Sequence, residues 1–559
     1  MQRCLFIAFF SIFLCFIPQE LRAFDIHIKD DKSFTAKMEE LLKVYNIPSV
    51  SACILKKGKN GIWDIAWEGT YGYRIAIRPR IRADQDTIYA IGSITKTFTA
   101  TAVMQLVEKG LIDLDEDVST YMPFPIKNPG LNYNDPDDPV PPITVRYLLS
   151  HRSGLPKTTF DFFTEHKDLS YLDFGVFRNI DELRVYLSRK ESWARADPDK
   201  KGKIYYKPGE KYCYSNVGYL ILGFLIEQVI NKDTDKRITW KQYIIKNILA
   251  PLGMRNTKFY WLDYPRGTNL AQGYIEKRFV SRINPDYPLD ALGKLESYTK
   301  GVPIYRYILV PENPALMNPT AGILYNTGGA AGQMLSTASD LAYFMVAHLN
   351  KGKGYARDKD GHVLYDKKHK PAEISILSQK SIRAMHNVDD SGLCEITDLS
   401  KSDSDLGLSR LTGYGLGWMR VNWGGRYWNY PWNPGMNPQK GVDWKGLRKA
   451  GVKRRKVGQV SDVNMCNGLD VEGNAGDLPG YHAEMYQVSD DLAIICLTNE
   501  DFSEETRDES RMQPRRFKHY TTDRDEGKTL KDVDGAFPHN WVKYSEIEYL
   551  LLQKAASLN

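Results

Sequence analysis

Apolar residues recur at a helical spacing in some segments of the chain and gather in short runs in others. A spacing of three and four residues predicts amphipathic helices at residues 34–45 and 544–555, near the two ends of the sequence. Short apolar runs bounded by turn residues predict strands at residues 50–55 and 62–73. The pattern therefore predicts a mixed chain of helices and strands, an α/β or α+β protein.

Later segments show the same kinds of pattern. Two apolar runs, residues 481–488 and 492–497, are joined by a Ser-Asp-Asp turn, which predicts a β-hairpin. Residues 413–419 are expected to form a strand interrupted by glycines. The glycine-rich residues 326–332 predict close backbone packing and not a phosphate loop, because no Gly-Lys-Ser/Thr follows them. A helix capped by Ser336 is expected next.

A serine and a lysine stand three positions apart at the start of one predicted helix. Ser93 and Lys96 precede apolar residues at helical spacing over residues 98–107, and Gly110 ends the segment. Side chains three residues apart lie on the same face of a helix. The lysine amine is therefore expected beside the serine hydroxyl.

This pair has the residue types of nucleophilic catalysis. A serine hydroxyl is a weak nucleophile until a base takes its proton. The Lys96 amine can be that base only if burial or neighbouring positive charge keeps it neutral. The helix start adds free backbone N–H groups and a positive dipole end, which favour the oxyanion that forms when Ser93 attacks a carbonyl.

A tyrosine and an asparagine form a second candidate group. Tyr214 and Asn216 lie where a turn-rich loop meets an apolar helical run that extends to Ile230. A phenol can relay or accept a proton where lysine ammonium groups lower its pKa, and an amide can orient an acyl carbonyl or the lysine. We therefore expect this loop to present a phenol and a carboxamide into a cleft.

A histidine lies at the end of another short predicted helix. Thr144 can cap this helix, and Gly154 and Pro156 are expected to end it. His151 is a candidate catalytic base by residue type. Because nothing near it in the sequence pairs with it, we interpret His151 as a helix-end histidine that is bonded to backbone.

Composition and charge exclude some classes of function. The chain has 559 residues, 42% of them apolar and 26% charged, which suffices for a large core and two or more lobes. Its net charge of +6, from 75 basic and 69 acidic side chains, gives no field that indicates nucleic-acid binding. The 10 histidines show no metal-ligand spacing, so neither a metal nor another cofactor is predicted.

The first residues predict export. Residues 1–23 combine an early arginine, an apolar run and a proline break, which is the pattern of a secretory signal peptide. The apolar run is shorter than the roughly 20 residues that span a bilayer. We therefore expect a secreted or periplasmic protein with no stable membrane anchor after signal removal. Cys53 and Cys496 are expected to be buried thiols, while Cys394 and Cys466 could pair in an oxidising compartment.

The motifs, taken together and in order, resemble the serine β-lactamase-like family, which contains class C β-lactamases, DD-peptidases, D-aminopeptidases and related esterases. The resemblance covers residues 34–499 and includes Ser93-x-x-Lys96, Tyr214-x-Asn216, the segments 148–155 and 329–341, and the hairpin that ends at Asn499. It implies an antiparallel sheet flanked by helices, with a helical lobe and a site in the cleft between. It also implies that Ser93 is the acylated nucleophile, Lys96 its base, and Tyr214 the relay that later activates water, so we predict that the three side chains meet in one groove. Asn216 is a substrate-binding residue by the same resemblance.

The same resemblance implies a domain organisation. Residues 24–559 are expected to form one β-lactamase-like serine hydrolase domain after the signal peptide. Its helical lobe is expected at residues 91–324, inserted in the sheet lobe. Residues 262–320 and 427–473 show no persistent period and are expected to be long insertions.

The third family motif, a strand Lys-x-Gly or His-x-Gly, is altered in this chain. In register with the hairpin, Asn474 takes the place of the cation and Gly476 that of the glycine. An alternative register places His482 at the cation position, but it lacks the glycine. The resemblance implies that Asn474, Gly476 and Asp477 bind the substrate, and that the Asp477 N–H is the second oxyanion donor beside that of Ser93.

The missing cation affects the expected substrate. Penicillins and D-Ala-D-Ala stems carry a carboxylate that the strand cation helps to bind, and neutral Asn474 next to anionic Asp477 weakens that recognition. Neutral esters, or substrates with a free amine, fit such a site better. Lys445 or Arg448 of the second insertion could restore a positive charge.

We therefore predict an exported serine hydrolase that acts through a Ser93 acyl-enzyme on a small ester or a D-amino-acid amide or peptide. No nucleic-acid partner is predicted. Two alternatives stay open at this point. One is β-lactamase or DD-carboxypeptidase activity, and the other is a catalytically silent family member that binds peptidoglycan or peptide fragments.

Overall fold

The computed structural model describes the parts of the chain that carry the fold and the candidate site. The described residues are 31–44, 47–76, 80–155, 177, 179–193, 195–196, 203–235, 237–259, 268–276, 306–308, 329–358, 362–368, 370–387, 411–423, 469–478, 480–500 and 539–558. The predicted signal peptide, most of both predicted insertions, and Cys394 and Cys466 lie outside these residues. Within the described part of the chain, no helix has the length and apolar character that a membrane crossing requires.

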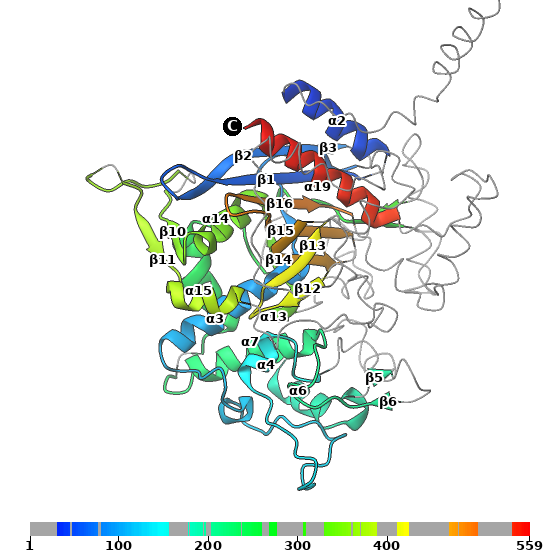
Figure 1. The fold of residues 1–559 in the computed structure, drawn as a ribbon, viewed down its shortest axis with the longest axis vertical. Helices are drawn as coiled ribbons and strands as arrows, with labels where there is room; N and C mark the ends of the chain where they lie inside the picture. Colours follow the sequence, from blue (N-terminus) through cyan, green and yellow to red (C-terminus); the bar gives the residue numbers. More distant parts are fainter. Residues whose placement is uncertain are drawn as a thin grey trace, which may run out of the picture.

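An eight-stranded antiparallel sheet forms the centre of the molecule (Figure 1). Its strands are β1 (Ser49–Lys57), β2 (Trp63–Ile75), β3 (Ile81–Arg82), β12 (Leu411–Tyr414), β13 (Met419–Trp423), β14 (Leu469–Leu478), β15 (Tyr481–Gln487) and β16 (Leu492–Thr498). Their order across the sheet is β12-β13-β14-β15-β16-β1-β2-β3. Val50 of β1 lies opposite Thr498 of β16, so segments from the two ends of the chain are neighbours. The predicted first strands and the predicted hairpin are confirmed.

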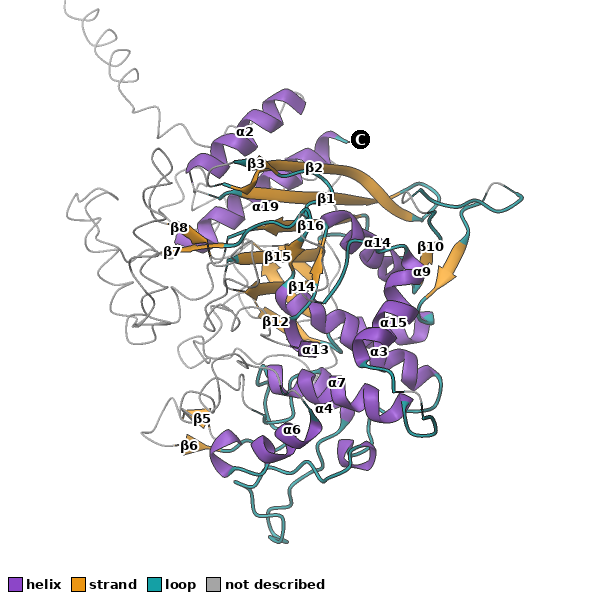
Figure 2. Ribbon diagram, turned by 180° about the vertical axis from the view of Figure 1, so that it is seen from behind, coloured by secondary structure: helices purple, strands orange, loops and turns teal. Residues whose placement is uncertain are grey.

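Two helices from opposite ends of the chain cover one face of this sheet. α2 (Asp31–Val44) and α19 (His539–Ser557) lie side by side there, as Figures 1 and 2 show. Phe34 of α2 and Leu551 of α19 are buried in one cluster with Ile54 and Ile494 of the sheet. Burying a side chain of this size contributes roughly 1.5–3 kcal/mol. Both predicted terminal helices are thereby confirmed and held to the sheet.

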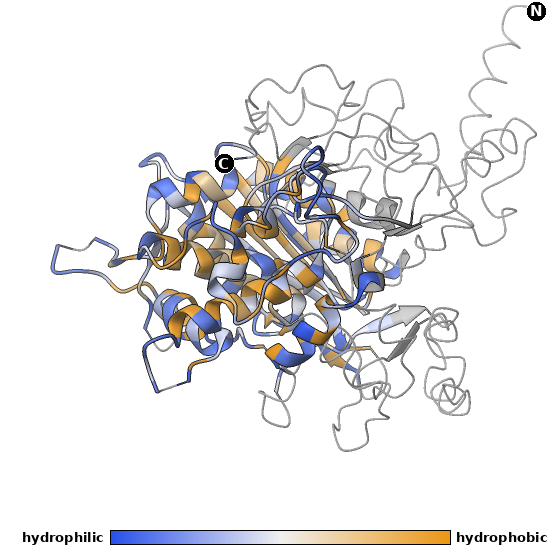
Figure 3. Cartoon of the chain, turned by 90° about the horizontal axis from the view of Figure 1, so that it is seen from below, coloured by the Kyte–Doolittle hydropathy of each residue, from blue (hydrophilic) through white to orange (hydrophobic). Residues whose placement is uncertain are grey.

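The opposite face of the sheet carries a layer of helices that contains the candidate site. Its central members are α3 (Thr95–Glu108), α7 (Asn216–Ile230), α13 (Gly329–Gly332) and α14 (Ala338–Leu349), seen in Figure 2. The rings of Phe98 and Phe344 stack with their centres 3.9 Å apart and join α3 to α14. Figure 3 shows apolar residues concentrated between the layers, with polar residues on the outer loops. The fold is thus a sheet between two helical layers.

Short elements complete the helical layer and its connections. In the part of the chain that the structure describes, the other α-helices are α4 (Val145–Leu149), α6 (Ile180–Leu187), α8 (Trp240–Ile244), α9 (Ala250–Leu252) and α15 (Gln379–His386). Small two-stranded sheets among the same residues pair β4 (Tyr89–Ala90) with β9 (Leu335–Ser336), β5 (Arg195–Ala196) with β6 (Lys203–Ile204), β7 (Tyr274–Glu276) with β8 (Arg306–Ile308), and β10 (Lys353–Tyr355) with β11 (Glu373–Ser375). The β4/β9 pair leads directly into the site.

The structure corrects two predicted helix ends. Thr337 caps α14, because its side chain accepts a hydrogen bond from the Asp340 N–H at 3.1 Å, whereas Ser336 lies in β9. The helix that Thr144 caps ends at Leu149 and does not extend to Gly154. In both cases the predicted residue lies outside the helix, because Ser336 pairs with Tyr89 of the neighbouring strand and Gly154 comes after the last helical residue, Leu149.

The structure also tests the predictions for the glycine-interrupted strand, for the second insertion and for two cysteines. Residues 413–419 form the end of β12, a turn and the start of β13, because Gly417 has a φ of 84° that interrupts an extended strand. Residues 469–473 of the second predicted insertion belong to β14. Cys53 and Cys496 are buried thiols, as expected.

Candidate active site

The chain reaches Ser93 through a short strand and a tight turn. The Ile91 N–H at the end of β4 donates to the Met334 carbonyl oxygen at 3.0 Å. Gly92 follows with a φ of 47°, which side-chain-bearing residues rarely adopt. Ser93 then lies in the 3₁₀ turn η2 (Gly92–Ile94), directly before α3. The predicted helix therefore begins with a 3₁₀ turn that presents the serine.

The Lys96 side chain is completely buried and reaches Ser93. Its Nζ donates to Ser93 Oγ at 2.9 Å and to the Ala331 carbonyl oxygen at 2.6 Å. Burial lowers the pKa of Lys96 well below its usual value, because removing an ammonium from water disfavours the charged form. A neutral amine at this position can accept the Ser93 hydroxyl proton.

The Tyr214 phenol completes a group of three. Its OH donates to Ser93 Oγ at 2.7 Å, and its ring centre lies 4.9 Å from Lys96 Nζ. Tyr214 ends the loop before α7, and Ser215 caps that helix by accepting the Gly218 N–H at 3.0 Å. The structure thus confirms that the hydroxyl, the amine and the phenol meet. Their chemical roles stay predictions.

The two asparagines that were predicted to bind substrate differ in exposure. Asn216 is the first residue of α7 and is half-buried, so part of its side chain is accessible. Asn474 on β14 is completely buried, and its Nδ2 donates to the Gly417 carbonyl oxygen at 3.0 Å. A substrate contact stays a prediction for both residues. The structure gives the Asn474 amide a backbone partner inside the protein.

β14 passes so close to Ser93 that position 476 has room only for glycine. A Cβ atom added to Gly476 would lie 2.6 Å from the Ser93 nitrogen and 2.0 Å from the Ile91 oxygen, closer than real Cβ contacts come. Asp477 follows Gly476 directly in β14. Its predicted part as the second oxyanion donor, beside the N–H of Ser93, stays a prediction.

The alternative register that uses His482 as the strand cation is wrong. His482 lies opposite Asp477 in the β14/β15 pair, so their side chains share one face of the sheet. Gly476 is the neighbour of Asp477 in β14, and neighbouring residues of a strand face opposite sides. His482 therefore points away from the face on which Gly476 contacts Ser93. On its own face, His482 Nε2 lies 3.4 Å from Glu484 Oε1.

Sequence reasoning missed the second partner of Lys96. The close packing predicted for the glycine-rich segment is present, since Thr99 Oγ1 donates to the Ala330 carbonyl oxygen at 2.7 Å. A Cβ atom added to Gly223 of α7 would lie only 2.7 Å from Ala330 Cβ. The glycines were the available signal, but they do not indicate that the Ala331 carbonyl faces Lys96.

His151 is bonded to backbone, as the sequence analysis expected. Its Nδ1 accepts a hydrogen bond from the Ser215 N–H at 3.0 Å. A second contact of His151 was not predicted, because the residues involved are far apart in the chain. The His151 ring lies with its centre 4.3 Å from that of Tyr214.

The sequence matches the model of a known protein family. The family model described as Beta-lactamase matches residues 34–515, which is most of the chain. The chain belongs to the β-lactamase family. Members of this family are serine hydrolases, and the antiparallel sheet with its covering helices is the β-lactamase/transpeptidase-like fold.

Individual relatives match parts of the chain. Protein flp from Staphylococcus aureus (strain MW2) is 30% identical over 237 residues, which is 42% of this chain and 40% of that protein. Beta-lactamase-like protein 2 from Dictyostelium discoideum is 31% identical over 266 residues, 46% of this chain and 42% of that protein. The chain thus matches about two fifths of the length of these relatives. The octameric penicillin-binding protein homologue from Pyrococcus abyssi shares the fold at 20% identity and a TM-score of 0.51, covering 93% of this chain and 81% of that one.

Proposed function

We propose that this protein is an exported serine hydrolase that forms an acyl-enzyme at Ser93 with a small ester or a D-amino-acid amide or peptide. One observation carries the proposal: Ser93 Oγ lies 2.9 Å from Lys96 Nζ and 2.7 Å from the Tyr214 OH. A nucleophilic serine needs a proton acceptor within hydrogen-bond distance, and this group supplies an amine and a phenol.

The first half of the reaction forms the acyl-enzyme. The neutral Lys96 amine takes the hydroxyl proton of Ser93 as Oγ attacks the substrate carbonyl carbon, and the N–H groups of Ser93 and Asp477 stabilise the oxyanion. The bond to the leaving alcohol or amine then breaks, the Tyr214 OH passes a proton to that group, and the Lys96 ammonium returns its proton to the Tyr214 oxygen. The Ala331 carbonyl oxygen accepts from Nζ throughout and keeps it near Oγ.

The second half of the reaction releases the acid. Water attacks the acyl carbon, and Tyr214 together with Lys96 takes the proton of that water. Ser93 Oγ leaves and regains its proton from the same groups. Asn216, the half-buried first residue of α7, orients the acyl group in this proposal.

Covalent labelling tests the proposed nucleophile. A fluorophosphonate probe is expected to form an adduct on Ser93 of the wild type, located by peptide mass spectrometry, and to leave Ser93→Ala unlabelled. Ser339→Ala is a matched control, because the Ser339 hydroxyl donates to Glu68 and takes no part in the proposed site. An adduct on another residue, or equal labelling of Ser93→Ala, contradicts the proposal.

The neutral side chain of Asn474 favours a substrate without a carboxylate. Asn474 donates its amide to Gly417 and supplies no positive charge for a substrate carboxylate. Penicillins and D-Ala-D-Ala stems lose a charge-assisted hydrogen bond at such a site, whereas neutral esters and amides lose nothing.

Asn474→Lys is expected to shift this preference. The ratio of kcat/KM for a chromogenic cephalosporin to that for a p-nitrophenyl ester should rise about tenfold, because a lysine whose ammonium extends to the cephalosporin carboxylate adds a charge-assisted hydrogen bond. Asn474→Gln, which stays neutral, should leave the ratio near that of the wild type. A wild type that already hydrolyses the cephalosporin as well as the ester would favour the β-lactamase or DD-carboxypeptidase alternative.

The activity assays also test the silent alternative, whereas export needs a separate measurement. Binding of peptidoglycan fragments without turnover of any ester, amide or β-lactam would favour a catalytically silent member. Export rests on the signal pattern of residues 1–23. The N-terminal sequence of the protein isolated from cells that produce it shows whether this segment has been removed.

A further inference from the structure

We propose that His151 is a positioning residue that holds the Tyr214 phenol against Ser93. This inference rests on the proposed function, because it assigns His151 a part in the same reaction. His151 lies on the connection after α4, and Tyr214 lies on the loop before α7. It does not touch the reacting atoms and acts through the tyrosine.

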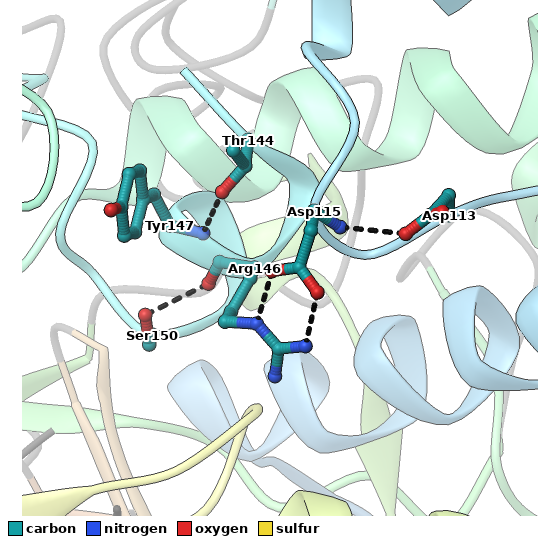
Figure 4. Close-up of polar contacts among 6 residues, drawn as sticks. All are labelled: Asp113, Asp115, Thr144, Arg146, Tyr147 and Ser150. Carbon is teal, nitrogen blue, oxygen red and sulfur yellow. Dashed lines mark hydrogen bonds and ion pairs between the residues drawn. The ribbon is translucent and has the colours of Figure 1, made fainter. Parts of the chain in front are cut away.

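The helix that leads to His151 is fixed at both ends (Figure 4). Thr144 caps its start by accepting a backbone N–H at 3.1 Å. Arg146 donates to the two carboxylate oxygens of Asp115 at 2.6 and 2.7 Å and so joins the helix to the preceding loop. At its end, Ser150 Oγ donates to the Arg146 carbonyl oxygen at 2.8 Å. These bonds place His151 on an anchored segment.

The backbone of His151 is in a conformation that favours glycine and asparagine. Its φ is 59°, in the left-handed region. Histidine adopts this region more often than most residues with a side chain, but the conformation still costs free energy, and residues held in it are concentrated at functional sites. The contacts of the His151 side chain and carbonyl group therefore hold this backbone conformation.

Three contacts join His151 to the segment that carries Tyr214. The His151 carbonyl oxygen accepts the Cys213 N–H at 2.7 Å, and Nδ1 accepts the Ser215 N–H at 3.0 Å. Cys213 and Ser215 are the two neighbours of Tyr214. Between these two bonds, the imidazole packs on the Tyr214 ring at 4.3 Å between centres. The tyrosine is thus held at its backbone on both sides and at its ring.

The imidazole itself sits among aromatic rings. The ring centres of Tyr414, Tyr219 and Tyr212 lie 4.5, 5.1 and 5.9 Å from that of His151, which is completely buried. Because Nδ1 accepts a hydrogen bond, it carries no proton, and in the neutral ring the proton is on Nε2. Nδ1 is occupied by Ser215, which separates this role from that of a general base.

Other hydrogen bonds join the same two segments without the His151 side chain. The Gly209 N–H donates to the Arg152 carbonyl oxygen at 2.7 Å, and the Tyr219 OH donates to the Leu149 carbonyl oxygen at 2.7 Å. Substitutions of His151 are therefore expected to leave the segments docked and to affect chiefly the placement of the Tyr214 phenol.

Two variants separate the contributions of His151. His151→Gly relieves the backbone strain but removes the acceptor and the ring. His151→Asn tolerates the left-handed backbone, and its Oδ1 can replace Nδ1 as the acceptor for Ser215. The acylation rate constant of His151→Gly at saturating ester should fall about 10- to 100-fold with little change in KM, as for a misplaced catalytic group. His151→Asn should recover most of that loss.

A double-mutant cycle with Tyr214→Phe tests whether His151 acts through the phenol. Because the phenol is absent from Tyr214→Phe, adding His151→Gly to it should lower the rate constant little further. Full additivity of the two losses, or a wild-type rate for His151→Gly, overturns the inference. The inference is also overturned if His151→Asn and His151→Gly lose the same factor in the acylation rate constant and this loss parallels a fall in their melting temperatures. A wild type without label on Ser93 refutes the proposed function itself, so the two failures are distinct.

Discussion

Replacing Lys96 with methionine is expected to reduce the acylation rate constant about 10³-fold, since the substitution removes the proton acceptor of Ser93. Methionine is apolar and flexible and fits the buried position without an ammonium. Single-turnover kinetics with an ester substrate measure this step. Lys109→Met, at the C-terminal end of the same helix, is the matched control and should keep wild-type kinetics. A Lys96→Met enzyme with near-normal acylation would leave the amine without the assigned role.

The buried amine also predicts how activity depends on pH. Lys96 acts while it is neutral, and burial holds its pKa well below the ordinary value of 10.5. The kcat/KM of the wild type should therefore fall as the pH drops through that lowered pKa, because protonation removes the base. A pH profile of kcat/KM shows this acid limb.

The free energy of unfolding should also increase as the pH rises. Between its lowered pKa in the folded state and 10.5 in the unfolded state, Lys96 binds fewer protons when the chain is folded. The wild type therefore gains free energy of unfolding as the pH rises through this window. Lys96→Met lacks that gain, so the free energy of unfolding of the wild type should increase relative to that of Lys96→Met as the pH rises. Denaturant unfolding at several pH values measures it, and a constant difference contradicts a neutral Lys96.

Gly476→Ala is expected to lower kcat about 10²- to 10³-fold, the effect of losing one oxyanion donor. The added methyl would lie 2.0 Å from the Ile91 oxygen and 2.6 Å from the Ser93 nitrogen, so β14 and the serine turn must move apart. This overpacking should also reduce the free energy of unfolding by roughly 1–3 kcal/mol. Steady-state kinetics and denaturant unfolding measure the two effects.

Gly218→Ala provides the matched control for that substitution. Gly218 lies in the first turn of α7 beside the site, and the nearest atom to an added Cβ is 3.5 Å away, an ordinary contact. This variant should keep both kcat and stability near those of the wild type. If Gly476→Ala behaves in the same way, the close approach of β14 is not needed for the oxyanion site.

Local elements of the fold were predictable because they depend on residues close in the sequence. Helical spacing identified α2 and α19, and apolar runs identified the β15/β16 hairpin. The order of strands was not predictable from these patterns. The pairing of Val50 with Thr498 depends on which apolar faces meet when the chain collapses, and a one-dimensional period carries no record of that choice.

The candidate site divides in the same way. The spacing of Ser93 and Lys96 placed hydroxyl and amine on one helix turn, while Tyr214 was expected beside them from its motif and the family resemblance. The His151 contact with Tyr214 was missed, because no rule of spacing relates residues on two separate segments. The burial of Asn474 was missed for the same reason.

The sequence by itself determined the kinds of elements, the residue types of the site and the loss of the strand cation, all of which are properties of short segments. Only the tertiary structure decided that Lys96 is sealed from water, that the Ala331 carbonyl accepts its hydrogen bond, and that β14 touches the Ser93 turn at Gly476. The physical reason is that desolvation and close backbone approach arise from atoms distant along the chain. Both exist only once the sheet and the helical layer have packed together.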